Sequence, residues 1–365
     1  MQRILNFLQQ GLWGVAIFLA LRGNAAHGVL VLSVLAVPLL RFLFFRSYRA
    51  AWNKKFQEDA RLLLHPTLGR IPWRILFRRI FLPALALYLV NGRNLLLSSY
   101  DNFGTHMTAI ALLETGSPNV GPYLEASRRE GKLPYSFRTI GEGIYSSYPL
   151  GMVGFALPVF AGAKILGADL GKHQWRLAKL VAALVASASL VLAYLVLSVL
   201  VSGSVALWCM GFLAVASCVF TVVGQGLWTN GGVFFWEWVF LFLGLLSPFP
   251  LVPSLVLQGF ALSQMVSNRL TAVLFIAPLL LFFARISWRK TLWVVGAFFL
   301  FLLPWGLFYQ RVYGTPFGPQ QSQGTGFAFT YSQFVSVFPA LLFSPARGFF
   351  IYNPWALLLG LGVLF

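Results

Sequence analysis

Residues 177–201 have the sequence LAKLVAALVASASLVLAYLVLSVLV, an apolar stretch long enough to cross a lipid bilayer as one helix. A helix needs about 20 apolar residues to span the ~30 Å of hydrocarbon. The whole chain has this character, because 58% of its residues are hydrophobic, only 10% are charged and its mean hydropathy is +0.77. Most segments could not be solvated on any face. The composition therefore predicts an all-α polytopic membrane protein.

Further apolar stretches predict the remaining spans. They fall near residues 4–22, 27–45, 77–97, 205–223, 233–247, 251–267, 270–286 and 291–309, and one more begins near Trp355. That last stretch stops at Phe365 before it is long enough to span, so we expect the complete protein to be longer. The first stretch lacks a short apolar core with a cleavage site, so we expect a retained helix rather than a signal peptide. Cys209 and Cys218 share one predicted span, where we expect small buried side chains.

The net charge of +18 would suggest a nucleic-acid partner in a soluble protein, but the basic residues lie beside predicted spans. One loop, residues 46–79, contains Arg46, Arg49, Lys54, Lys55, Arg61, Arg70, Arg74, Arg78 and Arg79. Lys and Arg clustered beside spans mark the cytoplasmic side and attract anionic lipid headgroups. We therefore expect the lipid bilayer as a partner and no nucleic acid. The predicted parts are a transmembrane hairpin (1–45), a basic cytoplasmic loop (46–79) and a transmembrane domain (80–365).

A second basic segment, Arg285 to Lys290, is also expected in the cytoplasm. Counting spans between the two basic segments puts residues 98–176 and 310–352 on the other side of the membrane. Residues 151–166 then cannot cross, and their length of roughly 16 residues suits a juxtamembrane or re-entrant helix. We expect carboxylate chemistry in the first of these loops. Its acidic residues are Asp101, Glu114, Glu125, Glu130, Glu142 and Asp169.

Asp101 stands just past an apolar run, at the head of the longest polar stretch between apolar segments. At this water boundary, partial desolvation makes a carboxylate a better general base. The alternative is that Asp101 caps the helix that we expect to start near Phe103. His106 lies little more than one helical turn further on. We expect it either to share a site with Asp101 or to lie on an exposed polar face.

The second half of the loop offers Arg138, Glu142, Tyr145 and Tyr148 as substrate-binding candidates. The tyrosines could instead anchor the protein at the membrane interface. Arg138 and Glu142 would pair with each other if their stretch were helical. Asp101 and Glu142 could hold a divalent metal, but no ligand spacing is diagnostic, so the cofactor remains unknown.

Two arginines are candidates for holding a phosphate, because a guanidinium can bind it through two parallel hydrogen bonds. Arg347 lies in a loop bounded by Pro345 and Gly348, and Arg269 lies between two predicted spans on the non-cytoplasmic side. The alternative for Arg347 is that it snorkels to the membrane surface.

A polar, Gly-rich turn separates two further spans and contains Gln225, Trp228 and Asn230. Trp228 would suit stacking on a sugar or isoprenoid, although the segment could also be a plain interfacial turn. Glu237 follows within a span. Carboxylates inside membranes are costly and by default functional, so Glu237 is a further candidate for binding substrate from the rim.

Four stretches, in this order, resemble the bacterial GT-C membrane glycosyltransferases related to protein mannosyltransferases. They are Tyr100-Asp101 with Leu112 to Gly116, Tyr148 to Gly151, Gln225 to Gly232, and Ser344 to Gly348 with Tyr352 to Pro354. The resemblance implies that Asp101 is the catalytic base and that the donor is a polyprenyl-phosphate sugar. Relatives often have a second acidic residue where Asn102 stands and a His near Asn230.

This resemblance implies a GT-C-like transmembrane helical bundle with a long first extracytoplasmic loop that carries juxtamembrane helices. The expected activity is inverting transfer of a monosaccharide to a glycan, lipid or protein acceptor outside the cell inner membrane. Arg347 and Arg269 would hold the donor phosphate. A transporter or flippase of a lipid-linked or anionic solute is the alternative, with Glu237 in the path, although no inverted repeat is visible. A non-catalytic subunit of a polysaccharide assembly complex is the third hypothesis. The sequence leaves the sugar, the acceptor and the oligomeric state open.

Overall fold

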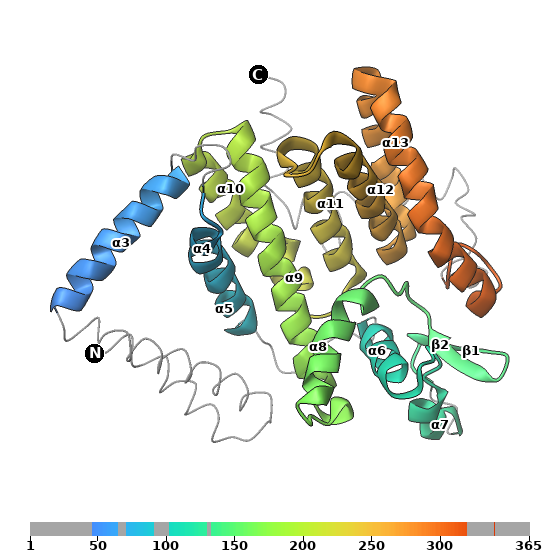
Figure 1. Cartoon of the computed structure of the whole chain (residues 1–365). Coiled ribbons are helices and arrows are strands. Elements are labelled where there is room, and N and C mark those ends of the chain that lie inside the picture. The colour runs from blue at the N-terminus through green and yellow to red at the C-terminus, as the bar shows by residue number, and fades with distance from the viewer. Residues whose placement is uncertain (1–45, 65–70, 91–101, 130–132, 320–338, 340–365) are drawn as a thin grey trace.

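The computed structural model describes residues 46–64, 71–90, 102–129, 133–319 and 339, most of which form a bundle of helices (Figure 1). The bundle starts with α3 (Arg46–Leu64), α4 (Trp73–Leu76), the π-helix η1 (Phe77–Phe81) and α5 (Leu82–Val90). It continues with α9 (Leu170–Leu200), α10 (Gly203–Ala216), the π-helix η4 (Val219–Val223), α11 (Thr229–Leu246), α12 (Leu251–Asn268), the short 3-10 helix η5 (Leu270–Ala272) and α13 (Val273–Tyr313). The predicted spans before residue 46, and the one that begins near Trp355, lie outside the described residues.

Three helices of the described part are long and apolar enough to cross a membrane. They are Leu170–Leu200, Thr229–Leu246 and Phe283–Tyr313. α9 is the central helix, because it packs against α5, α8, α10 and α11. α11 packs against α12, and α12 against α13. The prediction of a helical membrane protein is thereby confirmed.

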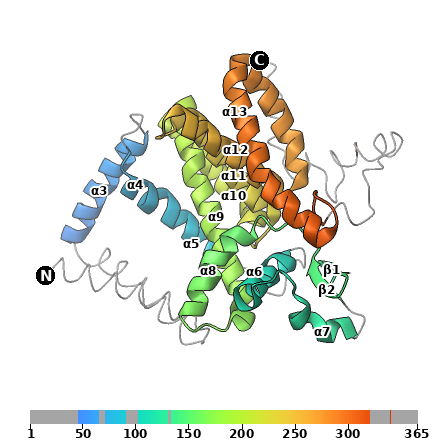
Figure 2. The ribbon, with the colours of Figure 1, turned by 45° about the vertical axis from the view of Figure 1, so that its right-hand side comes forward.

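α13 consists of two limbs that meet at Ser287, whose backbone (φ −159°, ψ 95°) is not helical. Ser287 lines a cavity together with Ser247, which follows the end of α11. In the second limb, Tyr309 donates a hydrogen bond to the Ser267 carbonyl at the far end of α12 (3.4 Å). The limbs therefore run antiparallel, as Figure 2 shows. The basic segment Arg285 to Lys290 lies at their junction, as expected for a turn between the stretches 270–286 and 291–309.

The end of α3 and the basic segment Arg285 to Lys290 lie at the same end of the bundle. Tyr194, near the end of α9, donates a hydrogen bond to the Leu63 carbonyl of α3 (2.7 Å). Lys179 donates to Gly224 (2.6 Å), so α9 and α11 both start at the opposite end. The ends of α9 and α11, the end of α3 and the kink at Ser287 thus share what we call the basic end.

Residues 46–64 of the predicted basic loop are helical, because most of them are good helix formers such as Ala, Leu, Arg, Lys and Gln. Asp59 of this helix is buried and pairs with Arg78 and with Arg79, whose Nε lies 2.9 Å from it. The ion pairs fix α3 to η1.

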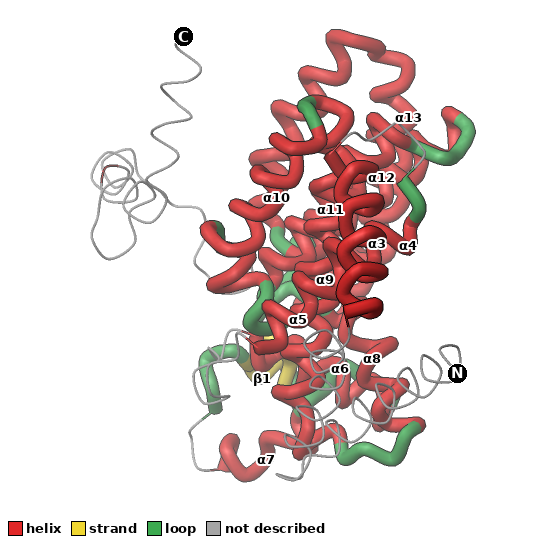
Figure 3. The backbone as a smooth tube through the Cα atoms, turned by 90° about the vertical axis from the view of Figure 1, so that its left-hand side faces the viewer, coloured by secondary structure: helices red, strands yellow, loops and turns green. Residues whose placement is uncertain are grey.

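The opposite end, which we call the hairpin end, carries the elements of the first long loop (Figure 3). They are α6 (Phe103–Thr115), α7 (Gly121–Arg129), the strands β1 (Phe137–Ile140) and β2 (Gly143–Ser146), and α8 (Val153–Ile165). α8 packs against α6 and α9 and lies beside the lower part of α9 in Figure 1. With 13 residues and an internal Pro158, it has the form expected for a juxtamembrane helix.

One conditional pairing is not met, and one expectation is wrong. Arg138 to Glu142 is not helical but forms the first strand and the turn of an antiparallel β-hairpin, in which Arg138 lies opposite Tyr145. The condition under which Arg138 and Glu142 would pair, a helical stretch, is therefore not met. Cys209 and Cys218 are free and exposed on the bundle rather than buried. The outer face of a membrane bundle is itself apolar, so apolar neighbours in sequence do not distinguish a buried position from a lipid-facing one.

Candidate functional site

The Gly-rich turn between η4 and α11 is held in place by a lysine from the central helix. Lys179 of α9 donates to the Gly224 carbonyl (2.6 Å) and to the Gln225 side-chain oxygen (3.0 Å). The Gln225 amide in turn donates to the Phe220 carbonyl (3.0 Å). Trp228, half-buried, is the N-cap residue of α11, so its indole stands where the turn enters the helix. Gln225 and Trp228 therefore belong to one ordered turn.

This turn lies directly against the start of α6. Asn102 is the N-cap residue of α6 and is 2% exposed, and its side-chain amide contacts Gly226 so closely that a methyl group there would overlap it. The Asn102 side-chain oxygen has no hydrogen-bond partner among the described residues. Asp101 itself lies outside the described residues, but it precedes Asn102 directly. The helix start near Phe103 is confirmed, with Asn102 at the capping position.

A second contact joins the turn region to the end of α12. The exposed guanidinium of Arg269 donates a hydrogen bond to the side-chain oxygen of Asn230, in the first turn of α11. Two candidates that are far apart in sequence are thus paired. The neighbouring Asn268 is fully buried, and added methyl groups at Gly151 or Gly232 would overlap its side chain. These glycines allow the loop before α8, α11 and α12 to approach closely.

Two tyrosines of α13 tie the β-hairpin and the following loop to this region. Tyr309 accepts a hydrogen bond from the Leu150 backbone (3.1 Å) and donates one to Ser267. Tyr313 donates to the Ser146 carbonyl (3.0 Å), and its ring lies edge-on to Tyr145, with 6.2 Å between the centroids. Tyr145 and Arg138, opposite each other in the hairpin, are thus fixed to the same end of the bundle.

His106 is fully buried, so the expectation of an exposed polar face is wrong. Its ring packs edge-on against Trp175 of α9 (4.4 Å between centroids) and against Phe103 (5.2 Å). Neither ring nitrogen has a hydrogen-bond partner among the described residues. Burial lowers the pKa of His106 to about 3, because desolvation disfavours the charged ring. The ring is neutral at physiological pH and holds α6 against α9.

The remaining candidates are more scattered. Tyr148 is half-buried and follows β2, and Glu142 is exposed in the turn of the hairpin. Glu237 is half-buried on α11, two helical turns beyond its start at Thr229. Arg347 lies outside the described residues.

Two of the contributing residues were not predicted from the sequence. Lys179 had a detectable signal, since a lysine within an otherwise apolar span is costly unless it binds something. Asn268 had none, because an asparagine before Arg269 resembles an ordinary polar helix end.

The hairpin end thus combines amide side chains, an indole and the cations Arg138 and Arg269. Such groups suit binding of an anionic group together with hydroxyl groups. Within the described parts of the chain, no group of three or more His, Cys, Asp or Glu residues is placed to hold a metal ion. Comparison of this chain with protein-family models, with characterised proteins and with solved structures gave no match.

Proposed function

We propose that this protein is a membrane glycosyltransferase that moves a monosaccharide from a polyprenyl-phosphate donor to an extracytoplasmic acceptor, with inversion. Asp101 acts as the general base that deprotonates the acceptor hydroxyl. Arg269 and Arg347 hold the phosphate leaving group. Trp228 and the amides of Gln225 and Asn230 line the sugar site.

The contact between Asn102 and Gly226 carries this proposal. Asp101 is the residue before Asn102 in the sequence, and Asn102 contacts the turn that contains Gln225 and Trp228. The same turn leads into Asn230, which Arg269 contacts. Segments more than 100 residues apart, chosen from the sequence for a base and for a phosphate holder, therefore converge on one turn, as a transfer site requires.

The position of the basic residues supports the orientation. Arg285 to Lys290 and the end of α3 share the basic end, whereas the candidate site lies at the hairpin end. By the positive-inside rule, the basic end lies on the cytoplasmic side of the cell inner membrane. The site then faces outward, where polyprenyl-linked sugars are consumed after they have been flipped.

Lipid mass spectrometry of cells with and without the gene first identifies the donor. The test is then sugar transfer from the corresponding synthetic polyprenyl-phosphate sugar by the purified full-length protein. Asp101→Asn keeps the shape but removes the base, so turnover should fall by about 10²-fold or more while donor binding is kept. Glu125→Gln, an exposed carboxylate of α7, is the matched control and should keep full activity. Full activity in Asp101→Asn would overturn the catalytic assignment.

A second candidate, a transporter or flippase of an anionic solute, is favoured by the position of Glu237. This carboxylate is half-buried in the middle part of a candidate span, beside the indoles of Trp236 and Trp238. In a transporter, Glu237→Gln should abolish flux and Asp101→Asn should be mild. A transferase gives the reverse ranking, so the two variants separate the hypotheses.

A further inference from the structure

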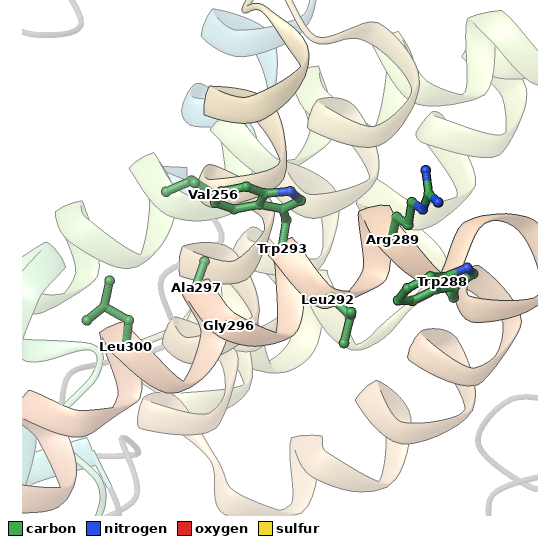
Figure 4. Close-up of a pocket in the computed structure, with 8 residues that line it drawn as sticks. All are labelled: Val256, Trp288, Arg289, Leu292, Trp293, Gly296, Ala297 and Leu300. Carbon is green, nitrogen blue, oxygen red and sulfur yellow. The ribbon is translucent and has the colours of Figure 1, made fainter.

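A groove at the basic end lies away from the candidate site and is independent of the proposed function. It has a volume of about 570 Å³ and runs along the second limb of α13, with one wall from α12 (Figure 4). Its lining includes Val256, Trp288, Arg289, Trp293, Gly296 and Leu300. Trp288, Trp293 and Leu300 are 60%, 55% and 63% exposed, so the groove opens to the surface of the bundle.

The two ends of the groove differ in chemistry. Arg289 stands at one end, with its guanidinium 5.7 Å from the ring centre of Trp288. Arg285 and Lys290, also exposed, add positive charge at the same kink, and α13 contains no acidic residue to neutralise them. Beyond Arg289 the groove is lined by apolar side chains. It therefore has a cationic mouth and an apolar floor, which complements an anionic amphiphile.

The length of the groove matches one leaflet of a bilayer. Arg289 and Leu300 are eleven residues apart on a helix, which corresponds to roughly 16 Å at 1.5 Å per residue. Half of the hydrocarbon thickness is about 15 Å. Gly296 lies partway along, and a side chain added there would meet nothing within 4 Å, so the floor has room for a chain. Tryptophans at this depth are typical of the membrane interface.

We propose that this groove is a specific site for an anionic phospholipid of the cytoplasmic leaflet. The headgroup phosphate binds Arg289, with Lys290 and Arg285 adding electrostatic attraction. One acyl chain lies along Trp293, Gly296 and Leu300. A free phosphate would gain nothing from the apolar floor, and a second copy of this chain would have to place an acidic group opposite Arg289.

The experiment uses the full-length protein in vesicles that contain phosphatidylglycerol or phosphatidylcholine carrying the same photoreactive acyl chain. After irradiation, lipid adducts are mapped by mass spectrometry of the peptide that contains residues 290–305. We expect phosphatidylglycerol to label it several-fold more than phosphatidylcholine does. Arg289→Gln should reduce this ratio to about one. Gly296→Leu should reduce labelling by both lipids, because it fills the groove. Gly211→Leu on α10, which also meets open space, is the matched control and should change neither value.

Three results would overturn the proposal. Equal labelling by the two lipids would show a non-specific lipid surface. Absence of adducts from either lipid at this peptide would show that the groove is covered by protein rather than lipid. Loss of the preference on addition of millimolar inorganic phosphate would show a simple anion site. Arg289→Gln and Gly296→Leu change exposed positions, so both variants should fold. Retention of the thermal transition of the parent protein checks this.

Discussion

The side-chain amide of Asn102 lies directly against Gly226, so the start of α6 and the turn before α11 meet where only a glycine fits. This contact joins the segment that contains the proposed base to the segment proposed to bind the sugar. Its tightness makes it a sensitive point for testing the proposed site.

Gly226→Ala should impair sugar transfer more than it impairs folding. The added methyl group would displace Asn102 and with it the start of α6, and shifts of about 1 Å at a catalytic group can cost up to 10²-fold in rate. We expect turnover to fall at least about tenfold, measured at saturating donor. The control is Gly154→Ala in α8, where nothing lies within 4 Å of the added group. Equal activity in Gly226→Ala and Gly154→Ala would show that the contact between Asn102 and Gly226 does not affect turnover.

Arg269→Gln should weaken donor binding by about 1.5–3 kcal/mol, the range for a hydrogen bond to a charged group. The loss should appear in the donor Kd, measured by titration calorimetry in detergent. Arg311→Gln removes the same charge from an exposed position near the end of α13 and serves as the control for net charge. If both variants lower affinity equally, Arg269 acts only through general electrostatics.

Lys179→Met should loosen the turn that carries Gln225, because two acceptors would lose their donor. Hydrogen exchange of backbone amides in residues 219–230 should become faster, while exchange in α12 stays unchanged. Lys172→Met, an exposed lysine near the start of α9, is the control. Unchanged exchange around Gln225 would show that the turn is held by other contacts.

His106 should make the protein less stable in mild acid. Its pKa in the folded protein is about 3, against 6.5 for a free histidine. Between these two pKa values the histidine of the unfolded chain is protonated, whereas buried His106 of the folded protein is not. The stabilising contribution of His106 to the free energy of unfolding is therefore complete above pH 6.5, the unfolded pKa, and is lost as the pH falls towards the folded pKa. The slope is about 1.4 kcal/mol per pH unit. Thermal unfolding between pH 7 and pH 4.5 should therefore be less pH-dependent in His106→Phe than in the parent protein, whereas His173→Phe should behave like the parent.

Opposite ends of the bundle should differ in access to an impermeant thiol reagent. Because Cys209 and Cys218 are exposed, both are first replaced by serine. A single cysteine at Thr139, on the exposed edge of β1, should then react from outside intact cells, and one at Lys290 only after permeabilisation. Labelling of Lys290→Cys from outside would reverse the orientation and move the site to the cytoplasm.

The class of this protein and the positions of most helices could be predicted from the sequence. Length and composition suffice for that, because a backbone in hydrocarbon must satisfy its hydrogen bonds within a helix. The stretches 233–247 and 251–267 correspond closely to α11 and α12. The same rule explains why the burial of Cys209 and the conformation of residues 138–142 could not be predicted. Apolarity could not tell whether Cys209 faces lipid or protein, and the polar segment 138–142 carried no membrane constraint that would distinguish a helix from a hairpin.

Which candidates lie together became clear only from the packing of the helices. Arg269 and Asn230 are 39 residues apart, and their pairing depends on how α11 and α12 pack, which no local pattern records. The burial of His106 against Trp175 follows from the packing of α6 on α9. The contact of Asn102 with Gly226 likewise depends on α6 folding back against the bundle. Such contacts arise from packing between segments distant in sequence, and local propensity carries no information about them.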